Sequence, residues 1–358
     1  LGVRDDLSDR AHPAPVASAA VSVPPSVVRE QPTSAQNGAG LRARPRKKKM
    51  LIIVNPYATT VSDRLKGLVV YALQGRYRVE AISTQAQNHA TEIGREVRDS
   101  GYDVVVAFGG DGTLNEVANG LAGSDVPVTV LPGGSTNVVA RTLGIPNDVV
   151  DATERLLGLA DDFRPRKIDL GTANGRRFVF ACGAGLDAMV VKRVDSHPHL
   201  KARFGPWFYT WAAISGFNRH FLLGSPARLR LRADGGESEG ITTIVQNSDP
   251  LTYFGERPVR ICREAAIDNG TISLAMLKRA ALRDMPTVAL RCLWDRFPAP
   301  NHRQIEAFER VTTARIESIS ADARGEPVLF PVQVDGDYIG DHEALDIGVE
   351  PGALTIVA

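Results

Sequence analysis

The clearest pattern in the sequence is an alternation, from residue 50 to about 158, of short apolar runs with longer segments of helical spacing. Continuous apolar runs cover residues 50–56, 103–108 and 126–132, and residues 77–84 alternate between apolar and polar. Apolar positions spaced as on one helix face cover residues 62–74, 89–101, 113–123, 136–144 and 148–158. Strands that alternate with helices predict a parallel sheet that is covered on both faces.

After Arg164 the pattern changes to one typical of antiparallel strands. Residues 167–185 predict a hairpin whose turn is Asn174-Gly175, and residues 227–248 predict a second hairpin. Further strands are expected within 258–265, 271–279, 310–319 and 327–340, and two helical stretches near 186–220 and 281–296.

The predicted fold class is therefore α/β plus mainly β, with a parallel-sheet domain followed by an antiparallel β-rich domain. We expect the α/β domain over residues 50–164, the β-rich domain over 165–345, and a C-terminal segment, 346–358, that returns to the first domain. Residues 1–49 are rich in Pro, Ala, Ser and charge and show no periodicity, which predicts a disordered tail.

The charge is balanced overall but not locally. The chain of 358 residues has a formal net charge of +1, so it is not a polycation built for nucleic acid. The run RARPRKKK, from Arg42 to Lys49, carries six positive charges and no acid. It is either a solvated linker end or a segment attracted to anionic lipid headgroups.

The sequence favours a protein of the cytosol. Its three cysteines are far apart and form no CxxC spacing, which gives no support for a zinc site or a disulfide framework. No apolar run approaches the length of a membrane span, and no signal peptide is recognisable.

A glycine-rich turn follows the apolar run 103–108 and opens the helical segment after it. Gly109, Gly110 and Gly112 would let backbone N–H groups approach phosphate oxygens, and a helix N-terminus favours anions. Asp111 would repel a phosphate unless a cation lay between them, so its expected role is to hold Mg²⁺ against nucleotide phosphates. The alternative is a tight turn with a capping aspartate.

A similar arrangement recurs one strand later, in LPGGSTNVVAR (131–141). Thr136 and Asn137 there could contact phosphate or ribose. The sequence NPYATT ends the first strand, and the carboxyl ends of parallel strands meet at one edge of a sheet, where ligands bind. The three turns together predict a nucleotide site at that edge.

These motifs resemble the diacylglycerol kinase catalytic domain family. The resemblance rests on VNP, GGDGTLNEV and PGGSTNVVAR, and then on CGAGLDAMVV, NSDPLTYFGERPVRICREAAIDNGTISL and QVDGD, so it covers residues 50–358. The family includes bacterial diacylglycerol and other lipid kinases and is related to sphingosine and ceramide kinases. It shares its nucleotide fold with NAD kinase and phosphofructokinase.

The resemblance implies a set of site residues. It implies that Asp111 works with Mg²⁺ and that Asp335 and Asp337 are catalytic, with Asp337 as the proton acceptor. A structural Mg²⁺ would map to Asn269 and the carbonyls of Ala266 and Thr271. The residues implied in ATP binding are Asn55, Pro56, Thr84, Gly109, Gly110, Asp111, Gly112, Thr113, Leu114, Asn115 and Thr136.

Some positions depart from the family pattern. Asp337 stands where the family usually has Glu, which shortens the reach of the proton acceptor by one methylene. Ser135 and Val138 replace a Gly and an Asp, NPYATT lacks the usual Ser-Gly pair, and Asn269 replaces a charged ligand.

The expected function is that of an ATP- and Mg²⁺-dependent lipid kinase that is peripherally associated with a membrane. Diacylglycerol is the preferred acceptor, which would give phosphatidic acid. A sphingoid base, another lipid alcohol or a soluble acceptor stays open, as does a nucleotide-binding regulator with weakened catalysis. No nucleic-acid partner is expected, and a homodimer is left open.

Overall fold

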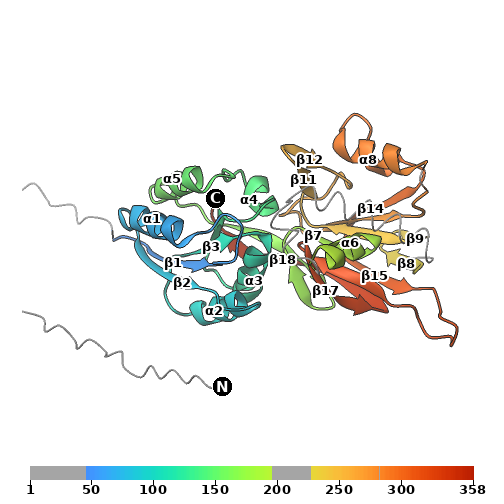
Figure 1. Cartoon of the computed structure of the whole chain (residues 1–358), viewed down its shortest axis with the longest axis horizontal. Helices are drawn as coiled ribbons and strands as arrows, with labels where there is room; N and C mark the ends of the chain where they lie inside the picture. Colours follow the sequence, from blue (N-terminus) through green and yellow to red (C-terminus); the bar gives the residue numbers. More distant parts are fainter. Residues whose placement is uncertain (1–45, 196–226, 282) are drawn as a thin grey trace, which may run out of the picture. The chain divides into compact units, whose positions relative to one another are not determined.

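Two kinds of sheet make up the part of the chain that the structure, a computed structural model, describes: residues 46–195, 227–281 and 283–358 (Figure 1). The predicted tail up to residue 45, with Arg42 and Arg44, and the predicted helical stretch beyond Asp195 lie outside these residues. Residues 46–358 belong to one compact unit.

The first half is an α/β layer. Strands β1, β2, β3 and β4 pair in parallel in the order β2-β1-β3-β4. Helices α1 and α5 cover one face of this sheet, and α2 and α3 cover the other (Figure 1). The elements are β1 (Lys49–Val54), α1 (Asp63–Gln74), β2 (Arg78–Ser83), α2 (His89–Val97), β3 (Val104–Gly109), α3 (Asp111–Leu121), β4 (Val128–Pro132), α4 (Val138–Thr142) and α5 (Val149–Leu159).

Local sequence explains these elements well. All six residues of β3 are buried, as expected for a strand that is covered on both faces. Ser62 caps α1 by accepting a hydrogen bond from the Leu65 N–H, and Asp148 caps α5 in the same way. Gly94 and Gly120 let α2 and α3 touch, since a Cβ on Gly120 would lie 2.8 Å from the Gly94 Cα.

The second half is mainly antiparallel, so the predicted fold class is confirmed. Its elements are β5 (Arg166–Ala173), β6 (Arg176–Phe178), β7 (Ala181–Gly185), α6 (Leu186–Asp195), β8 (Leu229–Ala233), β9 (Gly236–Gly240), β10 (Thr242–Gln246), β11 (Thr252–Phe254), β12 (Arg257–Val259), β13 (Ile272–Leu277), α8 (Met285–Leu293), the 3₁₀ helix η1 (Ala299–Asn301), β14 (Ile305–Val311), β15 (Thr313–Ser318), β16 (Phe330–Val334), β17 (Asp337–His342) and β18 (Ala344–Ile356).

The predicted turn at Asn174-Gly175 is present, and both residues have positive φ, 48° and 80°. Other elements differ from the prediction. The run 310–319 is divided at Thr312 between β14 and β15. Arg310, with a φ of 58°, lies within β14, where the pairing with β13 is irregular. The strand expected over 258–265 is reduced to β12, which ends at Val259.

The long strand β18 joins the two halves. It pairs antiparallel with β5 and β15 along most of its length, and Ile356 at its end pairs in parallel with Val128 of β4. The strand order β2-β1-β3-β4-β18-β15-β8-β9 is therefore continuous. A second sheet has the order β14-β13-β10-β7-β16-β17. The predicted domain boundaries stay predictions. The boundary predicted between residues 345 and 346 falls within β18.

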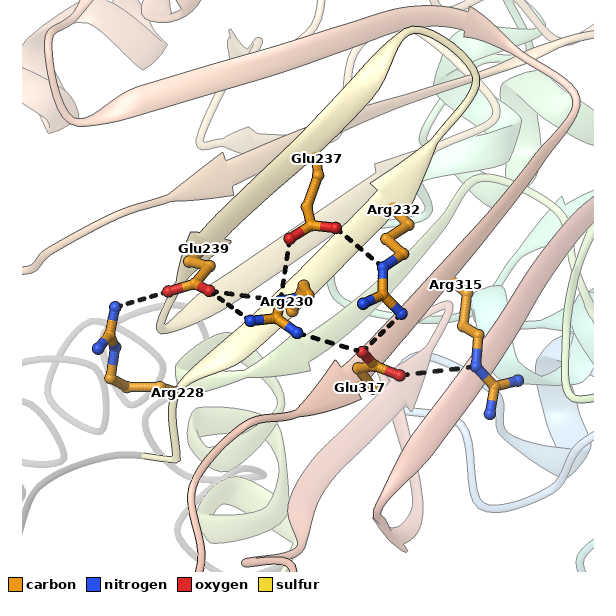
Figure 2. Close-up of polar contacts among 7 residues, drawn as sticks. All are labelled: Arg228, Arg230, Arg232, Glu237, Glu239, Arg315 and Glu317. Atoms are coloured by element: carbon orange, nitrogen blue, oxygen red, sulfur yellow. Dashed lines mark hydrogen bonds and ion pairs between the residues drawn. The ribbon is translucent and has the colours of Figure 1, made fainter.

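A ladder of opposite charges covers β8, β9 and β15 at the end of the larger sheet (Figure 2). Arg230 lies at its centre, within 2.9 Å of Glu239 and 3.0 Å of Glu237. Because β9 is the last strand in the order, these charges oppose edge-to-edge pairing with another sheet. The members are Arg228, Arg230, Arg232, Glu237, Glu239, Arg315 and Glu317.

Candidate nucleotide and phosphoryl-transfer site

A cavity of about 840 Å³ opens where the carboxyl ends of β1, β3 and β4 face the start of β17. It is lined by most of the residues that the sequence analysis singled out: Asn55, Thr84, Gly110, Asp111, Gly112, Thr113, Thr136, Asp335 and Asp337. Pro56, Gly109, Leu114 and Asn115 are not among the lining residues. The assigned roles stay predictions, but nine of the residues are brought to one cavity.

The two glycine turns are packed against each other. The Gly133 N–H donates a hydrogen bond of 2.8 Å to the Gly109 carbonyl. A Cβ on Gly134 would lie only 2.8 Å from the Gly110 Cα. The glycines are therefore needed for backbone contact between the β3–α3 and β4–α4 turns, and this contact brings both helix N-termini to the cavity.

Asp111 links the same two turns. It is the first residue of α3, and its carboxylate accepts hydrogen bonds from the N–H groups of Val138 (2.9 Å) and Val139 (3.1 Å) at the start of α4. Asp111 is therefore a capping residue, as the alternative interpretation of the sequence expected. The helix that it caps is α4, and not α3, to which it belongs. Burial raises the pKa of Asp111 to about 6 against the opposing effect of these hydrogen bonds, and the nearby Asp337 carboxylate raises it further.

Asp337 reaches the same point from the other half of the chain. A Cβ built on Gly112 would lie 2.9 Å from Asp337 Oδ2, so only glycine leaves room for this carboxylate. Two carboxylates, Asp111 and Asp337, therefore face a cavity that a helix N-terminus also reaches. Oxygen ligands of this kind suit Mg²⁺, and a cation would relieve their repulsion.

Asp335 is held differently from Asp337. It is 4% exposed and has a φ of 48°. Its carboxylate accepts hydrogen bonds from the N–H groups of Val179 (2.6 Å), Phe180 (2.9 Å) and Ala181 (3.0 Å). These contacts make Asp335 a brace between the β16–β17 turn and the start of β7. Its predicted catalytic role is not required to explain its position.

The remaining predicted residues support the turns. Asn55 Nδ2 donates to Thr113 Oγ1 at 3.1 Å, and Asn55 Oδ1 accepts from the Tyr57 N–H at 3.0 Å. Asn115 is 2% exposed and donates to Asp335, and Leu114 is 3% exposed in the core. The buried Asn115 and Leu114 orient the cavity wall without lining it, whereas Asn55 is one of the lining residues.

The predicted structural Mg²⁺ site at Asn269 has another explanation. Asn269 Oδ1 accepts hydrogen bonds from the N–H and the hydroxyl of Thr271, both at 2.9 Å, and Nδ2 donates to the Glu264 carbonyl. Within the described ranges, no group of three or more His, Cys, Asp or Glu side chains could hold a metal ion. The geometry therefore favours a turn at Asn269.

Asp187 and Gln333 are among the cavity residues that were not predicted. Gln333 Nε2 donates to Asp187 Oδ2 at 2.9 Å, and Gln333 Oε1 accepts from the Gly336 N–H at 2.9 Å. Burial raises the pKa of Asp187. These two hydrogen bonds link Asp187 through Gln333 to Gly336, and they therefore fix the turn that precedes Asp337. One sequence signal could have identified these two residues. Asp187 lies within CGAGLDAMVV and Gln333 within QVDGD, two of the segments that resemble the family.

A third unpredicted feature is the attachment of the β11–β12 hairpin to α4. The Arg141 guanidinium lies 3.6 Å from the centre of the Tyr253 ring. It also contacts the Gly255 carbonyl at 2.9 Å and Glu256 at 3.0 Å. Because Tyr253 and Gly255 line the cavity, Arg141 holds one of its walls in place.

Comparisons with known proteins find similarity to diacylglycerol kinases. Residues 49–173 match the family model described as "Diacylglycerol kinase catalytic domain". A diacylglycerol kinase from Staphylococcus aureus (strain bovine RF122 / ET3-1) is 26% identical over 312 residues, which cover 85% of this chain and 90% of that relative. The diacylglycerol kinase of strain JH9 is also 26% identical, over 310 residues.

Solved structures support the fold. The crystal structure of a diacylglycerol kinase from Bacillus anthracis str. Sterne superposes with a TM-score of 0.62 at 22% identity and covers 87% of this chain and 96% of its own. A second structure from this organism, provisionally named as the same kind of enzyme, gives a TM-score of 0.66 at 24% identity, with coverages of 87% and 97%.

Proposed function

We propose that this chain, whose residues 49–173 match the diacylglycerol kinase catalytic domain family, is a lipid kinase that transfers the γ-phosphoryl group of ATP to a lipid hydroxyl. The preferred acceptor is diacylglycerol, which gives phosphatidic acid, since the relatives from Staphylococcus aureus carry that name. ATP and Mg²⁺ are part of the same proposal.

The observation that carries the proposal is the approach of Asp337 to the glycine turn of α3. The Asp337 carboxylate lies beside Gly112, at the N-terminus of α3, and close to Asp111. Phosphoryl transfer needs a site for the phosphates, a cation that neutralises their charge, and a group that accepts the proton of the attacking hydroxyl. One cavity offers residues for all three.

Each residue then has a chemical task. The free N–H groups in the first turn of α3 bind phosphate oxygens, with Thr113 and Thr136 as hydroxyl donors. Asp111 would hold Mg²⁺, which would supply charge neutralisation at the transferred group. Asp337 accepts the proton of the lipid hydroxyl as the hydroxyl oxygen attacks the γ-phosphorus of ATP. Asp335 braces the turn that presents Asp337.

Two alternatives follow from the same cavity. A sphingoid base, another lipid alcohol or a soluble alcohol would use the same phosphoryl chemistry with a different acceptor pocket. The second alternative is a regulator with weakened catalysis, which is supported by Asp at position 337 in place of the longer Glu. The proximity of the Asp337 carboxylate to Gly112 argues against this alternative.

The test is the transfer of labelled γ-phosphate from ATP to a panel of lipids in mixed micelles with Mg²⁺. Wild type is compared with Asp111→Asn, Asp337→Asn and, as a matched carboxylate-to-amide control on exposed α5, Glu154→Gln. We expect phosphatidic acid from wild type and the control, and a loss of about 100-fold or more in the other two. Nucleotide binding without transfer to any lipid would instead support the regulator or a soluble acceptor.

Membrane association through the basic run is a separate part of the proposal. Arg46, Lys47, Lys49 and Arg78 line a hollow of about 550 Å³, which could receive an anionic headgroup. No helix within the described ranges is long and apolar enough to cross a bilayer. Peripheral association and a homodimer are tested by vesicle binding and by analytical ultracentrifugation.

A further inference from the structure

Large apolar side chains are exposed in one region more than elsewhere. Ten such residues are exposed in the described part of the chain, and four of them fall between positions 254 and 297. They are Phe254 (48% exposed), Leu290 (42%), Trp294 (52%) and Phe297 (50%). Singly exposed apolar residues are ordinary, but apolar residues that form one exposed patch mark an interaction surface.

These four residues come from two adjoining elements. Phe254 lies in the β11–β12 hairpin, and the other three belong to α8 and the turn after it. The Arg260 N–H, just beyond β12, donates a hydrogen bond of 2.9 Å to the Cys292 carbonyl at the end of α8. Figure 1 shows α8 beside β11 and β12. The exposed residues therefore belong to neighbouring segments.

Helix α8 is attached by one side only. Val288 and Cys292 pack on a small cluster of buried residues that includes Cys262 and Ala275. None of the nine residues of α8 is itself buried. The opposite side presents Leu290, with Trp294 four positions later, to the solvent.

The acids around this surface are paired with arginines, and among them the exposed Glu256, close to Phe254, is paired with Arg141 at 3.0 Å. Asp295 is paired with Arg260 at 3.0 Å. Arg257 and Arg296 are exposed, and no ion pair with an acid is described for either within the residues that the structure covers. The Arg296 guanidinium lies 5.9 Å from the centre of the Phe297 ring. Apolar side chains flanked by arginines are typical of segments that lie in the interface of an anionic membrane.

We propose that this hairpin–helix surface, made of Phe254, Arg257, Leu290, Trp294, Arg296 and Phe297, docks on an anionic lipid bilayer. The inference rests on the proposed function, because a kinase for a lipid must receive its acceptor from a membrane. The hairpin also forms a wall of the candidate site, since Tyr253 and Phe254 line the cavity. Docking here would bring the mouth of the cavity to the bilayer surface.

The test measures binding to sucrose-loaded vesicles by sedimentation, with no catalysis involved. Vesicles of phosphatidylcholine with phosphatidylglycerol are compared with vesicles of phosphatidylcholine alone. We expect Leu290→Ser/Trp294→Ser/Phe297→Ser to weaken binding to the anionic vesicles by about tenfold or more. We expect Arg257→Gln/Arg296→Gln to reduce the part of the binding that salt weakens.

A matched control replaces exposed apolar residues elsewhere. Leu68 and Tyr71 on α1 are 58% and 79% exposed, and Leu68→Ser/Tyr71→Ser should bind vesicles as wild type does. Equal binding by the triple variant and wild type would overturn the proposal, as would absence of wild-type binding. A wild-type dimer that the triple variant abolishes, without vesicle binding, would show that a second copy covers the surface and would also overturn it.

A kinase assay separates this proposal from the proposed function. With a short-chain diacylglycerol dissolved as monomers, turnover by the triple variant should equal that of wild type, while turnover on vesicle-borne diacylglycerol falls. If no variant phosphorylates any lipid but the vesicle binding changes as expected, the docking surface stands and the kinase assignment fails. If turnover on vesicles is unchanged in the triple variant, the docking surface fails and the kinase assignment stands.

Discussion

The Asn115 side chain donates a hydrogen bond of 2.7 Å to Asp335 Oδ2, across 220 positions of sequence. Both side chains are almost fully buried. The contact joins α3, which opens with the glycine motif, to the β16–β17 turn, which presents Asp337. The two halves of the candidate site are thus held together by a buried hydrogen bond.

Removal of this bond should destabilise the protein. Asn115→Ala removes one of the two donors to Asp335 Oδ2 and leaves the Val179 N–H as the other. Because a hydrogen bond to a buried carboxylate is lost, we expect the free energy of unfolding to fall by about 1–3 kcal/mol. Chemical denaturation measures it, and the exposed Asn301→Ala provides a control that should change stability little. An unchanged stability in Asn115→Ala would mean that the bond does not bridge the halves.

Asp111 should make stability depend on pH in a definite direction. Its folded-state pKa of about 6 lies above the ordinary value of 3.8, because burial disfavours the charged form. Between these values the folded protein binds a proton that the unfolded chain has lost. The free energy of unfolding contributed by Asp111 therefore decreases as pH rises from about 4 to about 6, by on the order of 2 kcal/mol.

Denaturation of wild type and Asp111→Asn over this pH range isolates the effect. The stability of wild type relative to the variant should decline with rising pH, because the variant has no group that titrates at this position. Mg²⁺ with nucleotide should reduce the decline, since a cation favours the carboxylate. A difference that is constant with pH would contradict the assigned pKa.

Gly112 should be essential for turnover and dispensable for folding. In Gly112→Ala the new Cβ would meet Asp337 Oδ2 at 2.9 Å and move the carboxylate aside. A displacement of about 1 Å in a catalytic group can cost on the order of 100-fold in rate. We therefore expect kcat to fall to that extent while the protein remains folded.

The control is Gly67→Ala in α1, where a Cβ meets nothing within 4 Å. This change should leave kcat unaltered and stabilise the helix by up to about 1 kcal/mol, as Ala favours helices over Gly. Full activity in Gly112→Ala would remove Asp337 from the proposed mechanism.

The Asp187–Gln333 hydrogen bond should act on turnover through the turn before Asp337. Gln333→Glu places two carboxylates together, which should displace Gly336 and lower kcat by about 10-fold or more, with little change in the KM for ATP. The double variant Asp187→Asn/Gln333→Glu reverses donor and acceptor and restores the bond. Recovery of kcat in the double variant identifies a positioning role, and no recovery would refute it.

The sequence by itself determined the α/β half of the fold. Continuous apolar strands, a capping Ser62 and the glycine turns are local signals, and each one predicts its own element. The order of these elements then brings Asn55, Gly110 and Thr136 to one sheet edge, because parallel strands have their carboxyl ends together. The Asn174-Gly175 turn was also predicted from a local signal, the Asn-Gly pair itself.

Only the tertiary structure decided how the second half completes the site. Asp335 braces a turn and Asp111 caps α4, and both depend on partners 27 to 220 positions away. Gln333 meets Asp187 and Arg141 meets Tyr253 across more than 100 positions. Such pairings follow from the way the sheets pack, and a single sequence carries no periodic or spacing signal for them.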